Sequence, residues 1–374
     1  MCRRLASALV ALLLPVSWAQ AVAQTLPRFP PAAVWNQEIS AAPLHANSAS
    51  MIATLEGLGG FGFGRMQIDF GLHVVRAVEG DPTRTIVEHP DGYYLPDCEP
   101  VGTSMPVPLG AAIEGQSDLF CDNLNEDCHL LVVQDQILYE AYRVDTFSSS
   151  ELEAQCLAIW RLDVVYPPEG RGEHCTSADA AGFPMAPLLF NADDIATSLA
   201  VDPTGDGDLG HAIRFILPNA RMANDPSLGG VEGRLYVRPA SHAGGPSGPV
   251  GSVPYGARLR LRSDFPLTGY NPAARVILNT FKRYGIVLAD GGTIALTAES
   301  DLFTTVSWAD LEVDSRIFDL TPGATDVAVG DFDVIDTGPR IGETYDCVRS
   351  EIDPGIFTDG FESGDTSAWS SSVP

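Results

Sequence analysis

Two carboxylates interrupt stretches of the chain that are otherwise apolar or made of small residues. Glu140 lies inside the run Leu138–Tyr142, and Asp179 lies within Ser177–Gly182. A carboxyl group in apolar surroundings has a raised pKa, which suits a general acid. Glycoside hydrolysis requires two carboxylates about 5–10 Å apart, and we expect Glu140 and Asp179 to form such a pair. The alternatives are a Glu140 that faces solvent beside Tyr139 and an Asp179 that caps a turn.

Three basic side chains are candidates to complete this site. His211 begins an apolar run and Arg214 lies within it, so a regular strand would place them on opposite faces. His242 lies in a glycine-rich loop after a strand, where functional residues are common. We expect His211 to be the third catalytic residue, and Arg214 and His242 to bind the substrate. A structural histidine at a strand start and an ordinary surface loop are the alternatives.

A turn-forming sequence carries three aspartates, Asp202, Asp206 and Asp208. Their oxygens are suitable ligands for Ca²⁺, although the spacing differs from that of an EF-hand loop. A solvated acidic turn is the alternative. We expect no other cofactor, because the chain lacks a phosphate-binding Gly-Lys-Ser/Thr loop, a dinucleotide-binding glycine motif after a strand and a His-Glu-x-x-His motif.

The first 23 residues have the pattern of a secretory signal peptide. Arg3 and Arg4 precede the apolar stretch Leu5–Val16, and small residues follow at positions that a signal peptidase would cut. The apolar stretch is too short to span a bilayer, and no second run of about 18 apolar residues follows. We therefore expect a secreted or extracellular protein without a membrane span.

Six cysteines follow the signal peptide, and disulfides are the default in an oxidising compartment. We expect Cys121–Cys128 and Cys156–Cys175 to be local pairs, which leaves Cys98 to pair with Cys347. Zinc is the rival interpretation, but the chain has no Cys-x-x-Cys pair.

The charge of the chain limits its partners. It has 22 lysines and arginines against 49 aspartates and glutamates, a formal net charge of −27. Such a field repels nucleic acid and anionic lipid. It is compatible with cations or neutral polymers as partners, or serves solubility alone.

Short apolar or alternating runs separated by turns predict an all-β protein, most simply a β-sandwich or jelly roll. These predicted strands are Met66–Val78, His129–Val133, Ile137–Val144, Cys156–Val165, His211–Leu217, Arg234–Val237, Ala257–Arg262, Gly285–Ala289, Thr293–Thr297 and Thr325–Ile335. One well-defined helix is expected over Asn271–Tyr284, with Asn271 as its N-cap, and a shorter one over Asn191–Ala200. We divide the chain into a linker (24–34), one β-rich domain (35–350) and a C-terminal tail without a core-forming pattern (356–374).

Several stretches within residues 33 to 320 resemble an uncharacterised family of secreted proteins found in soil bacteria and fungi. The stretches are Trp35-Asn36, Asn47–Ala49, His129–Val133, Leu138–Glu140, Thr176–Gly182, His211–Phe215 and Arg258–Ser263. The tail, with Asp359–Asp365 and Ser367–Trp369, is similar to a short segment shared by secreted proteins of Gram-negative bacteria, which implies a handling or sorting role.

The resemblance implies a protein directed at an extracellular polysaccharide or cell-wall glycan. With paired carboxylates, the expected activity is hydrolysis of a polysaccharide. The alternative is a non-catalytic glycan-binding protein that uses exposed aromatic side chains, for which the candidates are Trp35, Tyr93, Tyr94 and Tyr255.

Overall fold

The computed structural model describes residues 22–122 and 127–350. The predicted tail, and the predicted signal peptide apart from its last two residues, lie outside the described residues. Strands in several sheets dominate the described part, together with three α-helices. The fold therefore belongs to the all-β class, as predicted, whereas a sandwich or jelly roll for the whole chain stays a prediction. None of the described helices is long and apolar enough to cross a membrane.

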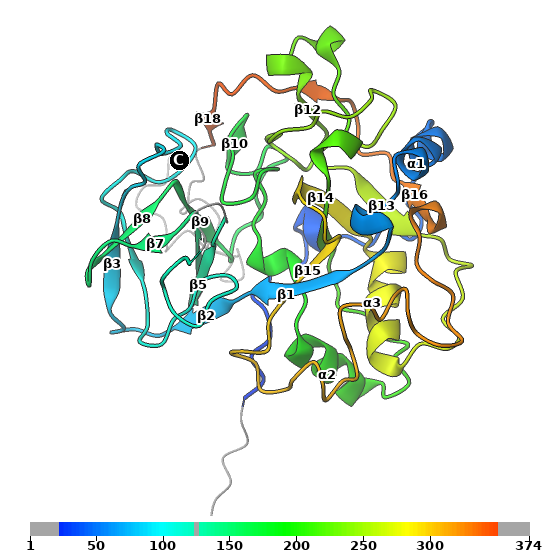
Figure 1. Ribbon diagram of the computed structural model, residues 1–374, viewed down its shortest axis with the longest axis horizontal. Coiled ribbons are helices and arrows are strands. Elements are labelled where there is room, and N and C mark those ends of the chain that lie inside the picture. The colour runs from blue at the N-terminus through cyan, green and yellow to red at the C-terminus, as the bar shows by residue number, and fades with distance from the viewer. Residues whose placement is uncertain (1–21, 123–126, 351–374) are drawn as a thin grey trace, which may run out of the picture.

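The largest sheet has six strands in the order β1-β15-β11-β14-β13-β16 (Figure 1). Their bounds are β1 Ile68–Leu72, β11 Ile213–Leu217, β13 Arg258–Leu261, β14 Ile286–Gly291, β15 Leu296–Glu299 and β16 Phe332–Val334. β1 runs parallel to β15 and β11 runs parallel to β14, while β13 is antiparallel to both of its neighbours. The sheet is mixed, so side chains from distant parts of the sequence meet along it.

Helix α3, Pro272–Arg283, packs against the six-stranded sheet and matches the predicted helix. The Oδ1 atom of its N-cap, Asn271, accepts the N–H of Ala274 at 2.8 Å. Helix α2, Ala192–Val201, also follows its prediction, and Asn191 caps it. Helix α1, Ser48–Gly57, was not predicted; the hydroxyl of Ser48 joins it to β16 by accepting the N–H of Val334.

Two four-stranded sheets lie beside the large one (Figure 1), with the orders β2-β5-β6-β9 and β4-β3-β8-β7. The first comprises β2 Val74–Ala77, β5 Leu130–Gln134, β6 Ile137–Tyr142 and β9 Cys156–Arg161. The second comprises β3 Thr83–Glu88, β4 Ser104–Pro106, β7 Asp145–Thr146 and β8 Glu151–Ala154. Both sheets contribute to one apolar cluster, which includes Val75, Ile86, Leu130, Val132, Leu152 and Leu157.

Two short ribbons complete the described sheets. β10, Gly172–Glu173, pairs with β18, Val348–Arg349, and β12, Leu235–Tyr236, pairs with β17, Ile341–Gly342. Both ribbons tie the last described residues to the middle of the chain.

The predicted strand Met66–Val78 divides at His73 into β1 and β2, which belong to different sheets. The imidazole of His73 bonds to the hydroxyl of Ser300 at 2.6 Å and to the carbonyl of Gln116 at 2.9 Å. One residue of chain, His73, therefore connects the large sheet directly to the first four-stranded sheet.

The sequence predicted that residues 24–34 are a linker. The structure corrects this prediction, because side chains of this segment are buried in the core. Leu26 and Phe29 are buried in the main apolar cluster. Arg28 forms an ion pair with Asp194 at 2.8 Å. The alternation of prolines with apolar residues reflects an extended segment that packs along the body, not a free connection.

The structure confirms one of the three predicted disulfides, Cys121–Cys128. The other two predicted pairs are wrong: the bonds are Cys98–Cys156 and Cys175–Cys347. Cys98 pairs with Cys156 because the chain runs beside β9 there, where the N–H of Glu99 donates to the carbonyl of Leu157 at 2.8 Å. This backbone approach is non-local, so sequence spacing could not indicate it.

Candidate functional site

Two adjoining cavities of about 560 and 310 Å³ form the candidate site, which we call the cleft. Asp127 and Asp290 line both cavities and so join them. The large sheet contributes Arg214 and Asp290, and the neighbouring four-stranded sheet contributes Tyr142. Polar side chains thus meet from two sheets at their junction, an ordinary location for a ligand site.

Arg214, on β11, holds the floor of the smaller cavity. Its side chain is 3 % exposed, and its Nε and Nη2 atoms donate to Oδ2 of Asp179 at 3.0 and 2.6 Å. Its Nη1 atom donates to the hydroxyl of Thr297 on β15 at 2.7 Å. Oδ2 of Asp290, at the end of β14, is 4.0 Å from Nη2. The guanidinium of Arg214 is thus hydrogen-bonded to Asp179, and the carboxylate of Asp290 lies farther from it.

Asp290 combines access to the cleft with a raised pKa. Its side chain keeps 30 % exposure. Burial first, and repulsion from Asp179 second, raise its pKa to about 7. The pKa of Asp179 is raised as well, because burial outweighs the attraction of Arg214. The raised pKa of Asp290 favours its protonated form, in which the carboxyl is a potential donor to a bound substrate.

His129 and Glu114 form a second charged pair at the smaller cavity. The Nδ1 atom of His129 lies 2.6 Å from Oε2 of Glu114, and its Nε2 atom lies 3.0 Å from the carbonyl of Ala178. Both ring nitrogens face acceptors, so both carry protons. Burial opposes this charge, but the Glu114 carboxylate raises the pKa of His129 to about 9. The imidazolium is therefore fixed in place beside Asp179.

Asp127 and two tyrosines form one wall of the larger cavity. The hydroxyl of Tyr142, on β6, donates to Oδ1 of Asp127 at 3.1 Å. The ring of Tyr94 stacks on that of Tyr142, with centroids 6.2 Å apart and an interplanar angle of 19°. Asp127 precedes Cys128, whose disulfide to Cys121 restrains it. The wall offers an apolar face beside a carboxylate.

His242 and Tyr345 form a second pair of stacked rings at the larger cavity. His242 stacks on Tyr345 with centroids 5.1 Å apart, and its Nδ1 atom lies 2.7 Å from the carbonyl of Ala180. Burial lowers the pKa of His242 to about 4. The ring is therefore neutral, donates through Nδ1 and keeps Nε2 as an acceptor. Arg234 lies over the ring of Tyr345.

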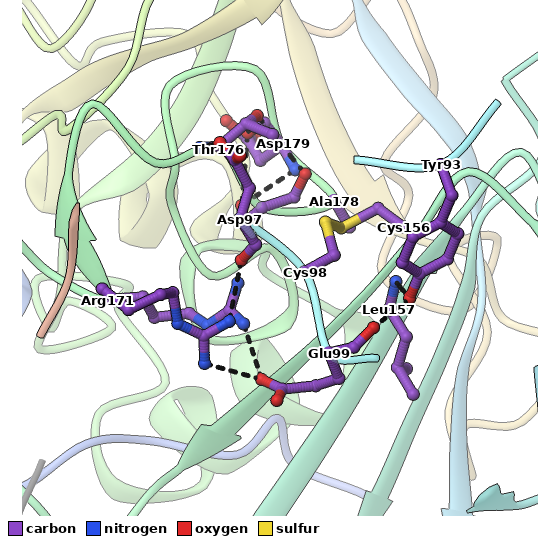
Figure 2. The surroundings of a disulfide bond; sticks show 12 residues. Tyr93, Asp97, Cys98, Glu99, Cys156, Leu157, Arg171, Thr176, Ala178 and Asp179 are labelled. Atoms are coloured by element: carbon purple, nitrogen blue, oxygen red, sulfur yellow. Dashed lines mark hydrogen bonds and ion pairs between the residues drawn. A yellow bond between two sulfur atoms is a disulfide. The ribbon is translucent and has the colours of Figure 1, made fainter. Parts of the chain in front are cut away.

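The Cys98–Cys156 disulfide anchors the segment that carries Tyr93 and Asp97 (Figure 2). Tyr94 belongs to the same segment. The hydroxyl of Tyr93 donates to the carbonyl of Glu99 at 2.6 Å and accepts the N–H of Leu157 at 3.1 Å. Residues 93–97 thereby lie along β9 and form part of the rim of the larger cavity.

Glu140 and Asp179, the predicted catalytic pair, are both fully buried, and neither lines the cleft. The Oε1 atom of Glu140 accepts the N–H groups of Met185 and Ala186 at 2.8 and 2.9 Å. Burial raises the pKa of Glu140 to about 7. These carboxylates lie behind the cleft: Asp179 positions Arg214, and Glu140 holds the loop at 185–186.

His211 does not join the other predicted catalytic residues. Its Nδ1 atom bonds to the carbonyl of Ala212 at 2.8 Å, and it lines neither cavity. Burial, and next the charge of Arg28, lower its pKa well below the usual value. His211 precedes β11, which begins at Ile213, and the backbone there is held away from the cleft by the bond from the N–H of Ala212 to the carbonyl of Trp35 at 2.8 Å. Of the predicted binding residues, Arg214 and His242 do line the cleft.

In the turn predicted to bind calcium, two of the three aspartates form ion pairs with arginines. Asp206 forms an ion pair with Arg275, and Asp208 forms one with Arg283. Asp202 accepts the hydroxyl and the N–H of Thr204. Throughout residues 22–122 and 127–350, no group of three or more acidic, histidine or cysteine side chains is arranged to hold a metal ion.

The predicted aromatic binding residues divide into two groups. Tyr93 and Tyr94 line the larger cavity. Trp35 and Tyr255 are buried at 8 % and 1 % exposure and cannot offer a surface to a glycan. The sequence pattern placed Asp127 and His129 on one face beside Cys128 without assigning them to the site, and it missed Tyr142 and Asp290 as members of the site. The one local signal for Asp290 is an acidic residue that ends a continuous apolar strand.

Comparison with known proteins identifies no relative: no protein-family model, no curated protein and no solved structure matches the chain. The resemblance of residues 33 to 320 to a secreted family therefore stays a prediction, and the function is inferred from the cleft.

Proposed function

We propose that this protein is a secreted carbohydrate-active enzyme that hydrolyses a polysaccharide in the cleft, with Asp290 as the general acid. The observation that carries the proposal is the pairing of Asp290, whose pKa is raised to about 7, with a second carboxylate, Asp127, at the same cavities. Glycoside hydrolysis uses two carboxyl groups at one site, one of which acts as an acid and benefits from a raised pKa.

The chemistry assigns one step to each residue. Asp290 donates its proton to the glycosidic oxygen as the bond to the sugar breaks, and Asp127 takes a proton from the water that attacks the sugar carbon. One water is consumed, and a new reducing end and a new hydroxyl result. Arg214 lies 4.0 Å from Asp290 and stabilises the carboxylate that the transfer leaves behind.

Tyrosine side chains support the binding part of the proposal. Sugar rings present apolar C–H faces that pack on aromatic rings, and Tyr93, Tyr94, Tyr142 and Tyr345 line the larger cavity. The same observation favours a second candidate function, retention of a glycan without cleavage. The two functions differ in product, not in ligand.

The test is a screen of purified protein against polysaccharides that records both retention and new reducing ends. Hydrolysis predicts reducing ends from at least one retained polymer. Tyr94→Ala should weaken retention by about fivefold, because stacking of this kind contributes on the order of 1 kcal/mol. Phe147→Ala, a surface aromatic outside the cleft, is the matched control. Retention without any new reducing ends would overturn hydrolysis and leave the binding function.

A further inference from the structure

The backbone of Gln24 is fixed on both sides by side chains of the body. Its N–H donates to Oδ2 of Asp193, in the first turn of α2, at 2.6 Å. Its carbonyl accepts N–H groups of Arg76 at 2.7 Å and of Asn191 at 2.8 Å. Residues 22–23, in contrast, are exposed. In the part of the chain that the structure describes, the hydrogen bonds that attach the N-terminal segment to the body therefore begin at Gln24.

The carboxylate of Asp193 is buried, with 0 % exposure, and it receives hydrogen bonds from neutral groups. Besides the N–H of Gln24, it accepts the N–H and the hydroxyl of Thr305 at 2.9 and 2.8 Å and the N–H of Val306 at 2.8 Å. Burial raises the pKa of Asp193, but the bonds from Thr305 and Gln24 outweigh it and keep the pKa below its ordinary value. The group is therefore ionised at neutral pH.

The charges next to Asp193 do not balance. Two further carboxylates lie nearby, and each has its own cation: Asp194 forms an ion pair with Arg28 at 2.8 Å, and Glu299 forms one with Arg76. Within residues 22–122 and 127–350, no ion pair joins Asp193 to a lysine, an arginine or a histidine. A buried charge without a partner is costly, so a third cation beside Asp193 would complete the arrangement.

We propose that signal peptidase cuts the chain between Ala23 and Gln24, and that the new α-ammonium group of Gln24 is the cation that pairs with Asp193. The sequence Ala21-Val22-Ala23 has the small residues that this peptidase requires before the cut bond. Hydrolysis of the bond consumes one water and leaves a carboxylate on Ala23 and an amine on Gln24, which the neighbouring carboxylate keeps protonated. The nitrogen atom that becomes the ammonium already lies 2.6 Å from Oδ2 of Asp193. A cut after Ala21 would instead place the charge on Val22, which is 77 % exposed.

The ion pair makes removal of the signal peptide the last step of folding, because it fastens residues 24–34 to α2. A chain that retains residues before Gln24 has a neutral amide at this position and leaves the charge of Asp193 unbalanced. The inference extends the predicted signal peptide and does not depend on the hydrolysis proposed for the cleft.

The first measurement is N-terminal sequencing, with intact mass, of the protein exported by its own signal peptide. The proposal predicts a single sequence that begins Gln-Thr-Leu-Pro and has a free amine. An N-terminal glutamine cyclises when its unprotonated amine attacks its side-chain amide and ammonia leaves, and the ion pair opposes this reaction by keeping the nitrogen protonated. A chain that starts at Val22 or at another residue, or a glutamine blocked by cyclisation, would overturn the proposal.

The second measurement compares the melting temperatures of two forms of the chain, one that begins at Gln24 and one that begins at Val22. Both forms carry an α-ammonium group, but only the first places it at Asp193, so the Gln24 form should melt about 2–4 °C higher. Asp193→Asn should reduce this difference to less than about 1 °C. Asp194→Asn is the matched control in the same turn of α2: it removes the ion pair with Arg28, lowers both melting temperatures and leaves the difference unchanged.

The two wild-type forms decide the question even if Asp193→Asn does not fold. Equal melting temperatures of these forms would contradict the ion pair, and so would a difference that persists in a folded Asp193→Asn variant.

Discussion

The charged groups in and behind the cleft form two sets, Arg214 with Asp179 and Asp290, and His129 with Glu114. The Nε and Nη2 atoms of Arg214 donate to Asp179. Oδ2 of Asp290 lies 4.0 Å from Nη2 of the same guanidinium. A carboxylate that cannot form a close ion pair in a partly buried position keeps its proton to higher pH. We infer that Asp179 maintains the protonated state of Asp290 by occupying Arg214. His129, fixed by Glu114, adds a positive charge that limits the effect.

Asp179→Asn should lower the pKa of Asp290. The substitution removes the competing carboxylate, and Arg214 is then free to attract Asp290. The pKa should fall from about 7 by at least one unit, as expected for an opposite charge within ~4–6 Å. The measurement is an NMR titration of protein labelled with ¹³C at aspartate carboxyls, with Asp290→Asn assigning the signal and circular dichroism checking the fold. A pKa of Asp290 unchanged by Asp179→Asn would refute the proposed role of Asp179.

Asp290→Asn should stabilise the protein at pH 8 and leave its stability at pH 4 unchanged. The folded-state pKa of about 7 lies above the unfolded value of about 4, so the folded state binds more protons between these values. Wild-type stability therefore falls as the pH rises through that window, and the amide variant escapes this loss. With allowance for screening by solvent, we expect a gain of about 1–2 kcal/mol at pH 8 in urea unfolding. Asp326→Asn, at an exposed carboxylate that lines neither cavity, should show no such gain.

At the scale of elements, disulfides and strands bring the cleft residues together from distant segments. The Cys98–Cys156 bond closes a 58-residue separation and holds residues 93–97 along β9. The N–H of Tyr94 donates to the carbonyl of Gln155 at 2.9 Å, which continues this attachment. The tyrosine wall therefore depends on a cross-link that lies outside both cavities.

Replacement of Cys98 and Cys156 by alanine should cost about 2–4 kcal/mol, because a long loop gains much entropy in the unfolded chain. The amide of Tyr94 should also exchange with deuterium faster, since its strand-like attachment loosens. Urea unfolding and hydrogen exchange measure the two effects. The double alanine variant of Cys121 and Cys128 is the control. The disulfide that it removes closes a separation of only 7 residues, so its loss should cost less stability. Equal losses in both variants would contradict this account.

Elements with strong local signals could be predicted from the sequence. Asn271 and Pro272 mark the start of α3, and the apolar run Ile286–Ala289 marks most of β14. Helix α1 also follows an asparagine, Asn47, but lacks the proline that marks the start of α3, and Asn47 makes no side-chain cap. Long-range pairings were out of reach, which is why the partners of Cys98 and Cys175 were predicted wrongly.

The candidate site shows the same limit. Arg214 and His242 lie at the cleft as predicted, and Glu140 and Asp179 are buried charges as their apolar neighbours indicated. The sequence could not reveal that these two carboxylates lie behind the cavity wall. Asp290 gains its role from a parallel pairing of β11 with β14, which no local pattern encodes.

At the scale of the whole molecule, the segment 24–34 joins elements that are far apart in the sequence. Phe29 contacts Trp160 and Tyr166 edge to face, with centroids 6.2 and 5.7 Å apart. The N–H of Gln24 donates to Oδ2 of Asp193 at 2.6 Å. The segment thus connects α2 with β9, which belong to different parts of the fold.

Phe29→Ala should therefore destabilise the whole protein by about 3–5 kcal/mol, the usual cost of removing a buried aromatic ring. Urea unfolding measures the loss. Val34→Ala is the control in the same segment, because Val34 is 42 % exposed and should change stability by no more than about 0.5 kcal/mol. A small effect of Phe29→Ala would show that the segment is a linker after all.

The central claim is that Asp290 supplies the proton for polysaccharide hydrolysis. The most direct test is the rate of reducing-end release by Asp290→Asn on a polymer that the wild-type protein cleaves, with Asp326→Asn as the matched control. Loss of a positioned general acid costs about 10²–10⁴-fold. We predict at least a hundredfold lower rate for Asp290→Asn, unchanged retention of the polymer and a wild-type rate for Asp326→Asn. A rate for Asp290→Asn within threefold of the wild type would contradict the claim.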